Sequence, residues 1–132
     1  MHQQFDSHAR ASAWLDDRLN GAERVGLPWG ALLAFLRLSA SPRVVSRPLT
    51  LLDASAVVRS WLELPSTWVP QPTSRHFETL AGLLAPEAKA DLVPDAHLAA
   101  LAIEHGLLLC STDRDFSRFD GLRWTDPLRP AG

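Results

Sequence analysis

One stretch near the C-terminus, LVPDAHLAALAIEHGLLLCSTDRDF (residues 92–116), constrains the fold more than any other part of the chain. It opens with a helical pattern in which Pro94 suits the first turn and Gly106 follows the last. The five residues LLLCS come next and predict a short strand, fully apolar as buried parallel strands are. Cys110 lies within that strand, so we expect it to be a small core residue. A helix that leads directly into such a strand indicates an α/β fold with a mainly parallel sheet.

The rest of the chain repeats this alternation of helices and short strands. Further helices are expected within residues 6–21, 29–40, 46–65 and 72–86, and further strands within residues 23–28, 66–71 and 120–128. The second of these helices is apolar almost all round, which predicts that it is buried. A length of 132 residues fits one domain, residues 1–132, with its own hydrophobic core.

Residues typical of helix ends support these boundaries. Asp6 or Ser7 is expected to cap the first helix, which Gly21 ends. Thr50 is expected to cap the third helix, and Thr73 lies near the cap of the fourth. The chain therefore opens in a helix, whereas α/β folds usually open with a hydrophobic strand.

Composition narrows the functional classes. The formal net charge of −2 argues against a broadly cationic surface, so a nucleic acid would need a local basic patch or metal ions. Lys89 is the one lysine among thirteen basic residues. A single cysteine rules out a disulfide framework, and the chain has neither an apolar run of transmembrane length nor a signal-peptide pattern. We expect a cytoplasmic protein that does not associate with membranes.

Three aspartates should meet at one edge of the sheet. The helix that begins near Asp95 descends about 15 Å at about 1.5 Å per residue, and the strand climbs back about 17 Å. Asp95 and Asp113 therefore return to nearly the same level, with Asp115 beside them. Open α/β sheets bind their ligands at this edge, beyond the carboxyl ends of the strands.

Clustered carboxylates repel one another unless a cation neutralises them, and oxygen ligands of this kind suit Mg²⁺ or Mn²⁺. Such an ion can activate water for phosphodiester hydrolysis without a histidine base. Two simpler interpretations stay open for the residues taken singly. Asp95 is favoured in the first turn of a helix for its interaction with the macrodipole, and Asp113 and Asp115 suit a solvated turn.

The segments DAHLAALAIEHG (residues 95–106) and STDRDFSRF (residues 111–119) also carry a family resemblance. They resemble PIN-domain ribonucleases, in particular the VapC toxins of VapBC toxin–antitoxin modules in their actinobacterial and mycobacterial branch. The likeness continues upstream through residues 29–50 and PTSRHFETLAGLL, and it covers nearly the whole chain.

The resemblance implies a three-layer α/β/α sandwich with a mainly parallel sheet and a Mg²⁺-dependent, RNA-cleaving site of about four acids. It also implies inhibition by a VapB antitoxin and, commonly, a homodimer. By position, Asp95 matches the third family acid and Asp113 the fourth, both as metal ligands. Asp115 matches an additional supporting aspartate, and Thr112 matches the hydroxyl residue beside the site.

Two departures from the family pattern stand out. The family's first acid ends an N-terminal strand, and neither that strand nor that acid is recognisable here, so the first strand is expected to be missing. Leu32 or a neighbour takes the place of the second acid, and nothing promotes Glu23 or Asp53 instead. A chain without the first strand and acid should be less stable and bind metal more weakly.

The predicted activity is therefore Mg²⁺-dependent endoribonuclease of the toxin type, with Asp95, Asp113 and Asp115 as catalytic metal ligands. Possible RNA contacts are Arg75, Arg114 and Arg118, for which a solvated surface role is an equal alternative. The alternative function is a truncated, inactive PIN-like protein that only binds a VapB-type antitoxin.

Overall fold

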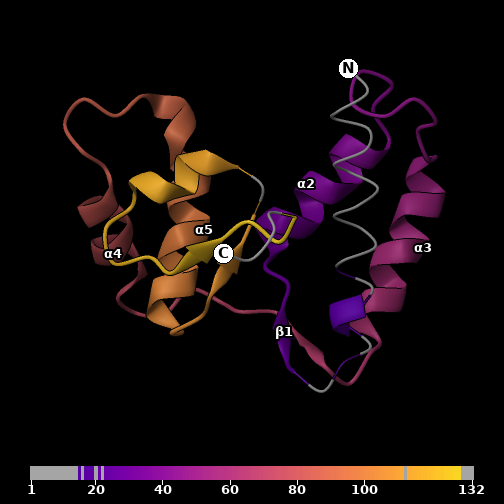
Figure 1. The fold of residues 1–132 in the computed structure, drawn as a ribbon, viewed down its shortest axis with the longest axis horizontal. Helices are drawn as coiled ribbons and strands as arrows, with labels where there is room; N and C mark the ends of the chain where they lie inside the picture. The colour runs from indigo at the N-terminus through magenta and orange to yellow at the C-terminus, as the bar shows by residue number, and fades with distance from the viewer. Residues whose placement is uncertain (1–14, 16, 20, 22, 112, 129–132) are drawn as a thin grey trace. The chain divides into compact units, whose positions relative to one another are not determined.

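The computed structural model describes residues 15, 17–19, 21, 23–111 and 113–128. The chain forms two compact units, Met1–Val69 and Pro70–Gly132, and each is described by itself. Figure 1 shows the course of the chain through the elements of both units. Most of the first predicted helix, with Asp6 and Ser7, lies outside the described residues; Leu15 and residues 17–19 are helical.

The first unit joins two helices to a pair of parallel strands. Its elements are β1 (Val25–Gly26), α2 (Trp29–Ser39), α3 (Leu51–Leu62) and β2 (Thr67–Trp68). β1 pairs with β2 in parallel, with Val25 opposite Thr67. The cap predicted at Thr50 is confirmed, because its side chain accepts a hydrogen bond of 3.0 Å from the backbone N–H of Asp53.

Helices α2 and α3 enclose the core of this unit. The buried residues are Leu19, Leu27, Leu32, Val58 and Trp61. The prediction that α2 is buried all round is wrong, since Trp29 is 50% and Leu33 57% exposed. Only one face of the helix packs on the core and on α3, and this leaves the opposite apolar face open among the described residues.

The second unit contains residues 92–116, with their helix, strand and three aspartates. Its elements are α4 (His76–Leu83), the 3-10 helix η1 (Ala90–Leu92), α5 (Val93–Glu104), β3 (Leu109–Cys110), the 3-10 helix η2 (Arg114–Arg118) and β4 (Trp124–Thr125). Helices α4 and α5 pack side by side (Figure 1). The core lies between α5 and η2 and comprises Ala96, Ala99, Phe116 and Phe119.

The ends of α5 follow the sequence. Pro94 lies in the first turn, where the missing N–H costs nothing. Gly106, with a φ of 63°, ends the helix in the left-handed region that glycine adopts without strain. The chain turns there and enters β3, which pairs in parallel with β4, with Leu109 opposite Trp124.

The strand after this turn is shorter and more exposed than predicted. Only Leu109 and Cys110 are extended and paired, Leu108 is 51% exposed, and Cys110 is exposed as well. The predictions of a five-residue buried strand and a core cysteine are therefore wrong. Within the described part of this unit, β3 pairs with one strand, β4.

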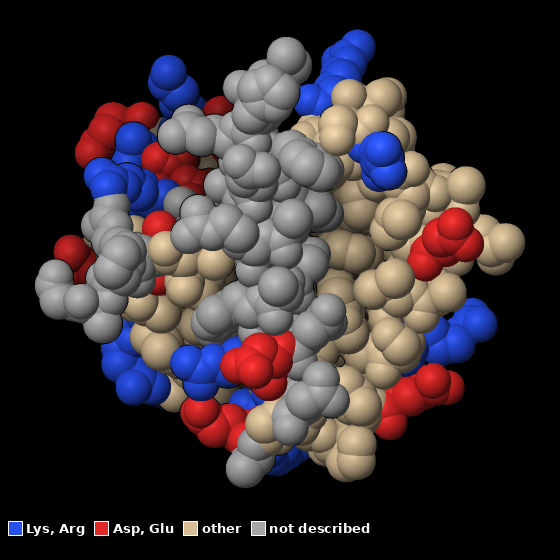
Figure 2. Space-filling view, turned by 45° about the vertical axis from the view of Figure 1, so that its right-hand side comes forward, with Lys and Arg blue, Asp and Glu red and all other residues tan. Residues whose placement is uncertain are grey.

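Both strand pairs are parallel and both units mix helices with strands, so the α/β class with parallel strands is confirmed. The three-layer arrangement and the missing first strand stay predictions. None of the helices in the described residues is long and apolar enough to cross a membrane. Figure 2 shows acidic and basic side chains in small groups of both signs among uncharged ones, as the small net charge suggests.

Candidate metal centre

Asp95 lies in the first turn of α5, which packs on η2 through Ala96 and Ala99. The residue that caps this helix is Leu92, which offers no side-chain hydrogen bond. Among the described residues, none donates a hydrogen bond to the Asp95 carboxylate. Capping by a hydrogen bond therefore does not explain this aspartate, although its place in the first turn still suits the helix dipole.

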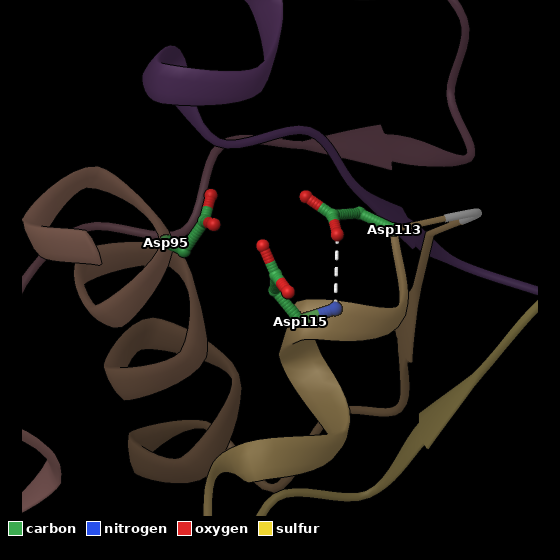
Figure 3. Close-up of side chains that lie close together, drawn as sticks. All are labelled: Asp95, Asp113 and Asp115. Carbon is green, nitrogen blue, oxygen red and sulfur yellow. Dashed lines mark hydrogen bonds between the residues drawn. The ribbon is translucent and has the colours of Figure 1, made fainter. Parts of the chain in front are cut away.

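Asp113 and Asp115 are fixed by the turn that follows β3. The backbone N–H of Asp115 donates a hydrogen bond of 2.9 Å to Oδ1 of Asp113, which caps η2 (Figure 3). The N–H of Asp113 donates in turn to Oγ of Ser111 at 3.1 Å. The turn interpretation is thus correct for one oxygen of Asp113, and this turn holds both carboxylates on the side that faces α5 (Figure 3).

The three carboxylates converge as the sequence argument predicted. One oxygen from each of Asp95, Asp113 and Asp115 lies within 4.8 Å of the other two. Figure 3 shows Asp95 projecting from α5 toward the two aspartates at the start of η2. Asp95 is partly buried and the other two are exposed, so the group opens to solvent on one side.

The electrostatics of this group are those of a cluster with an excess of negative charge. Partial burial raises the pKa of Asp95, and the charges of Asp113, Asp115 and Asp91 raise it further. A nearby cation would remove this penalty, because it favours the ionised form of each carboxylate. The cluster thus has the charge that a divalent ion neutralises.

The donor set also fits a small hard cation. Mg²⁺–oxygen bonds are about 2.1 Å long, so ligands on opposite sides of one ion lie about 4.2 Å apart. The three oxygens lie within 4.8 Å of one another, a limit above that value, so the carboxylates would draw closer together around a bound ion. Exclusively carboxylate donors favour Mg²⁺ or Mn²⁺ over softer metals.

The other residues singled out from the sequence lie around this group in different ways. Arg118 reaches it, with Nη2 at 3.7 Å from Oδ1 of Asp115. Arg114 is exposed on η2. Arg75 caps α4 and lines a separate cavity of about 320 Å³ with Thr73 and Glu104. Thr112 lies outside the described residues.

The positions considered for the second family acid give no further ligand. Leu32 is 2% exposed in the core of the first unit. Glu23 forms an ion pair of 2.8 Å with Arg18. Asp53 lies in the first turn of α3, where its backbone N–H serves the Thr50 cap.

A cavity of about 540 Å³ adjoins the cluster and escaped the sequence analysis. Asp95 and Asp115 form part of its wall, together with Lys89 and Arg118. Lys89 lies between α4 and η1, in a linking segment whose path no periodicity predicts. The one sequence signal for Lys89 is that the chain has no other lysine, but codon usage explains a single lysine equally well.

A buried polar network between α4 and α5 was also missed. Glu104 accepts hydrogen bonds from the N–H of Thr73 at 3.0 Å, from the Thr73 hydroxyl and from Nδ1 of His76. Nε2 of His76 lies 2.9 Å from Nδ1 of His97. The Glu104 side chain is only 3% exposed. These residues come from two separate segments, residues 73–76 and 97–104, so no local spacing indicated them.

Comparisons with known proteins identify the family of the chain. The PIN domain family matches residues 7–122. Ribonuclease VapC37 of Mycobacterium tuberculosis (H37Rv) is 46% identical over 123 residues, which are 92% of this chain and 85% of that protein. Ribonuclease VapC33 of M. tuberculosis (CDC 1551) is 44% identical over 126 residues, 95% of this chain and 88% of that protein.

A more distant relative shows the same relationship. VapC ribonuclease Mb2897 of Mycobacterium bovis is 35% identical over 122 residues, covering 92% of this chain and 83% of that protein. The fold, the acidic group and the extent of these matches define the class: the chain belongs to the PIN-domain family. Within that family it is of the VapC type, as the sequence resemblance predicted.

Proposed function

We propose that this protein is a metal-dependent endoribonuclease that acts as the toxin of a type II, VapBC-like toxin–antitoxin pair. The observation that carries the proposal is the convergence of Asp95, Asp113 and Asp115 within a chain of the VapC type. Carboxylates so placed hold a divalent cation in an open site, which is what phosphodiester hydrolysis needs.

Each aspartate has its own part in this proposal. Asp95 supplies the partly buried ligand from the rigid start of α5, while Asp113 and Asp115 supply exposed ligands from one turn. A bound Mg²⁺, or Mn²⁺ with the same ligands, lowers the pKa of coordinated water and stabilises the charge that develops on phosphate. The hydrogen bond from the backbone N–H of Asp115 to Oδ1 of Asp113 orients the Asp113 carboxylate before any ion binds.

The remaining expectations belong to the same proposal. Thr112 supports the site, and Arg75, Arg114 and Arg118 are candidate contacts to the RNA backbone. The two units together form one PIN-type domain with a three-layer α/β/α arrangement. The partners are an RNA substrate, a VapB-like antitoxin and a second copy of the chain in a homodimer, all in the cytoplasm.

The proposal is tested by RNA cleavage with Mg²⁺ and with EDTA. Asp95→Asn should lower the cleavage rate at least about a hundredfold, since it removes a charged ligand on which the site depends. Asp120→Asn makes the same chemical change at an exposed aspartate outside the cluster, and should leave the rate unchanged. Circular dichroism of both variants checks that they fold.

Two results would contradict the proposal. Cleavage by Asp95→Asn at the rate of the parent protein would remove this aspartate from the site. A folded parent protein that cleaves no RNA with Mg²⁺, yet binds a VapB-type protein, would establish the inactive binding module instead. No observation on the described residues favours that alternative.

A further inference from the structure

The cavity beside the acidic cluster has the size of a ligand site. Its volume of about 540 Å³ lies within the usual range for pockets that hold small molecules, about 300–1,000 Å³. It is formed by the segment that links α4 to η1, the start of α5 and the 3-10 helix η2. Asp95 and Asp115 belong to its wall, so whatever occupies the cavity lies against the candidate metal centre.

The lining combines three kinds of chemistry. Lys89 and Arg118 contribute cationic groups, and both side chains are exposed and able to move toward a ligand. Leu92 contributes partly covered apolar carbon, while Phe119 is only 5% exposed and offers the cavity little surface. Cations, apolar surface and a metal-binding edge match the phosphate, the base and sugar, and the reacting bond of a nucleotide.

The charge of the lining adds a condition on binding. Glu87, Asp91, Asp95 and Asp115 oppose the cations Lys89 and Arg118, so four carboxylates against two cations leave two net negative charges. Phosphate would be repelled from this wall until a divalent ion offsets the excess. The ion pair of 3.7 Å with Asp115 meanwhile keeps the Arg118 guanidinium at the boundary between the acids and the cavity.

We propose that this cavity seats the nucleotide next to the scissile bond of a single-stranded RNA, with Lys89 and Arg118 binding its phosphates. The inference rests on the proposed ribonuclease function. Lys89 is a positioning residue here, because it holds the substrate and does not touch the acidic group. Arg118 carries a planar group that can bind phosphate through two hydrogen bonds and leave Asp115 to the metal ion.

Cleavage kinetics provide the first test. Lys89→Gln should raise the KM for a single-stranded oligoribonucleotide about tenfold with little change in kcat, which is the value of one charge-assisted hydrogen bond. The salt dependence of log K should become shallower by about 0.7, as for one lost phosphate contact on a single strand. Lys89→Arg keeps the charge and should restore most of the affinity. Arg59→Gln removes one charge from a residue outside the cavity lining and should match the parent.

A chemical test uses the fact that the chain has one lysine. An amine-selective acylating reagent will modify Lys89 and the N-terminal amine, and mass spectrometry measures the two rates separately. The experiment uses the Asp113→Asn variant with Mg²⁺ in excess, because Asp113 does not line the cavity, its loss should prevent cleavage, and Asp95 and Asp115 remain to hold the ion. Added RNA should slow the modification of Lys89 severalfold without a matching change at the N-terminal amine.

The outcomes separate this inference from the function on which it rests. If the parent protein cleaves RNA while Lys89→Gln keeps its KM and RNA leaves the labelling of Lys89 unchanged, the cavity is not the substrate site and the ribonuclease function stands. If RNA shields Lys89 but the parent cleaves nothing, the binding site stands and the catalytic proposal fails.

Discussion

The two ends of helix α5 carry carboxylates in opposite circumstances. At its start, Asp95 faces the like charges of Asp113 and Asp115, and its pKa is raised by partial burial and by those charges. At its end, burial alone would raise the pKa of Glu104, but hydrogen bonds from Thr73 and His76 lower it below the ordinary value of 4.5. Among the described residues, one helix thus holds an acid that accepts no hydrogen bond and an acid that accepts three.

This difference between Asp95 and Glu104 distinguishes a candidate functional acid from a structural one, which residue type alone does not do. The Glu104 side chain is only 3% exposed, yet it accepts hydrogen bonds from Thr73 and His76 and joins α4 to α5. Asp95 is left in a repulsive group that costs stability, and such a cost persists in proteins mostly where a ligand removes it. This contrast supports the proposal that Asp95 serves a metal site, whereas Glu104 joins α4 to α5.

The largest change in stability should follow from a substitution of Glu104, which accepts hydrogen bonds at the end of α5. Glu104→Gln removes a buried charge that accepts hydrogen bonds from Thr73 and His76, and should lower the free energy of unfolding by about 1.5–3 kcal/mol. Urea denaturation followed by circular dichroism measures this loss. Glu78→Gln, at an exposed position on α4, should stay within about 0.5 kcal/mol of the parent. Equal stability of the two variants would show that the network is not structural.

A smaller change, this time an increase in stability, is expected from a substitution of Asp95 at the start of α5. Asp95→Asn removes like-charge repulsion, so without divalent ions at neutral pH it should stabilise the protein by up to about 1 kcal/mol. The raised pKa means that the folded state binds the Asp95 proton more tightly than the unfolded state does. The contribution of Asp95 to the stability of the parent protein is therefore greatest at a pH below the ordinary pKa of 3.8. This contribution is lost as the pH rises through the raised pKa of the folded protein.

The measurement is the difference in urea stability between parent and Asp95→Asn across pH 3 to 7. That difference should grow in favour of the variant as the pH rises, and His97, whose pKa is lowered by burial and by His76, cancels because both proteins contain it. A difference that does not change with pH would mean that Asp95 is not strained in the folded protein.

The contrast between these ends also marks what sequence could provide. The meeting of Asp95 and Asp113 followed from the rise per residue of a helix and a strand, and the structure brings both to one place. The boundaries of α5 followed from Pro94 and Gly106 for equally local reasons. The meeting of side chains within one helix–strand unit could therefore be predicted from the sequence.

Features that depend on tertiary neighbours were not within reach. The exposure of Cys110 reflects which strands flank β3, and composition does not report this. Glu104 and His76 are separated by 28 residues, and only the packing of α4 on α5 joins them. Lys89 likewise becomes a candidate functional residue only because the fold places it in the wall of a cavity. An apolar pattern predicts that a segment can be buried, while the neighbours decide whether it is.

The most direct test of the central claim is divalent-ion binding, measured with Mn²⁺ by electron paramagnetic resonance, which counts the free ion. The parent protein should bind Mn²⁺ at neutral pH in competition with Mg²⁺, and Asp95→Asn should bind it at least about tenfold more weakly. Glu78→Gln should bind as the parent does. Equal affinity of the parent and Asp95→Asn would contradict the account, because Asp95 would then not be a ligand of the divalent cation.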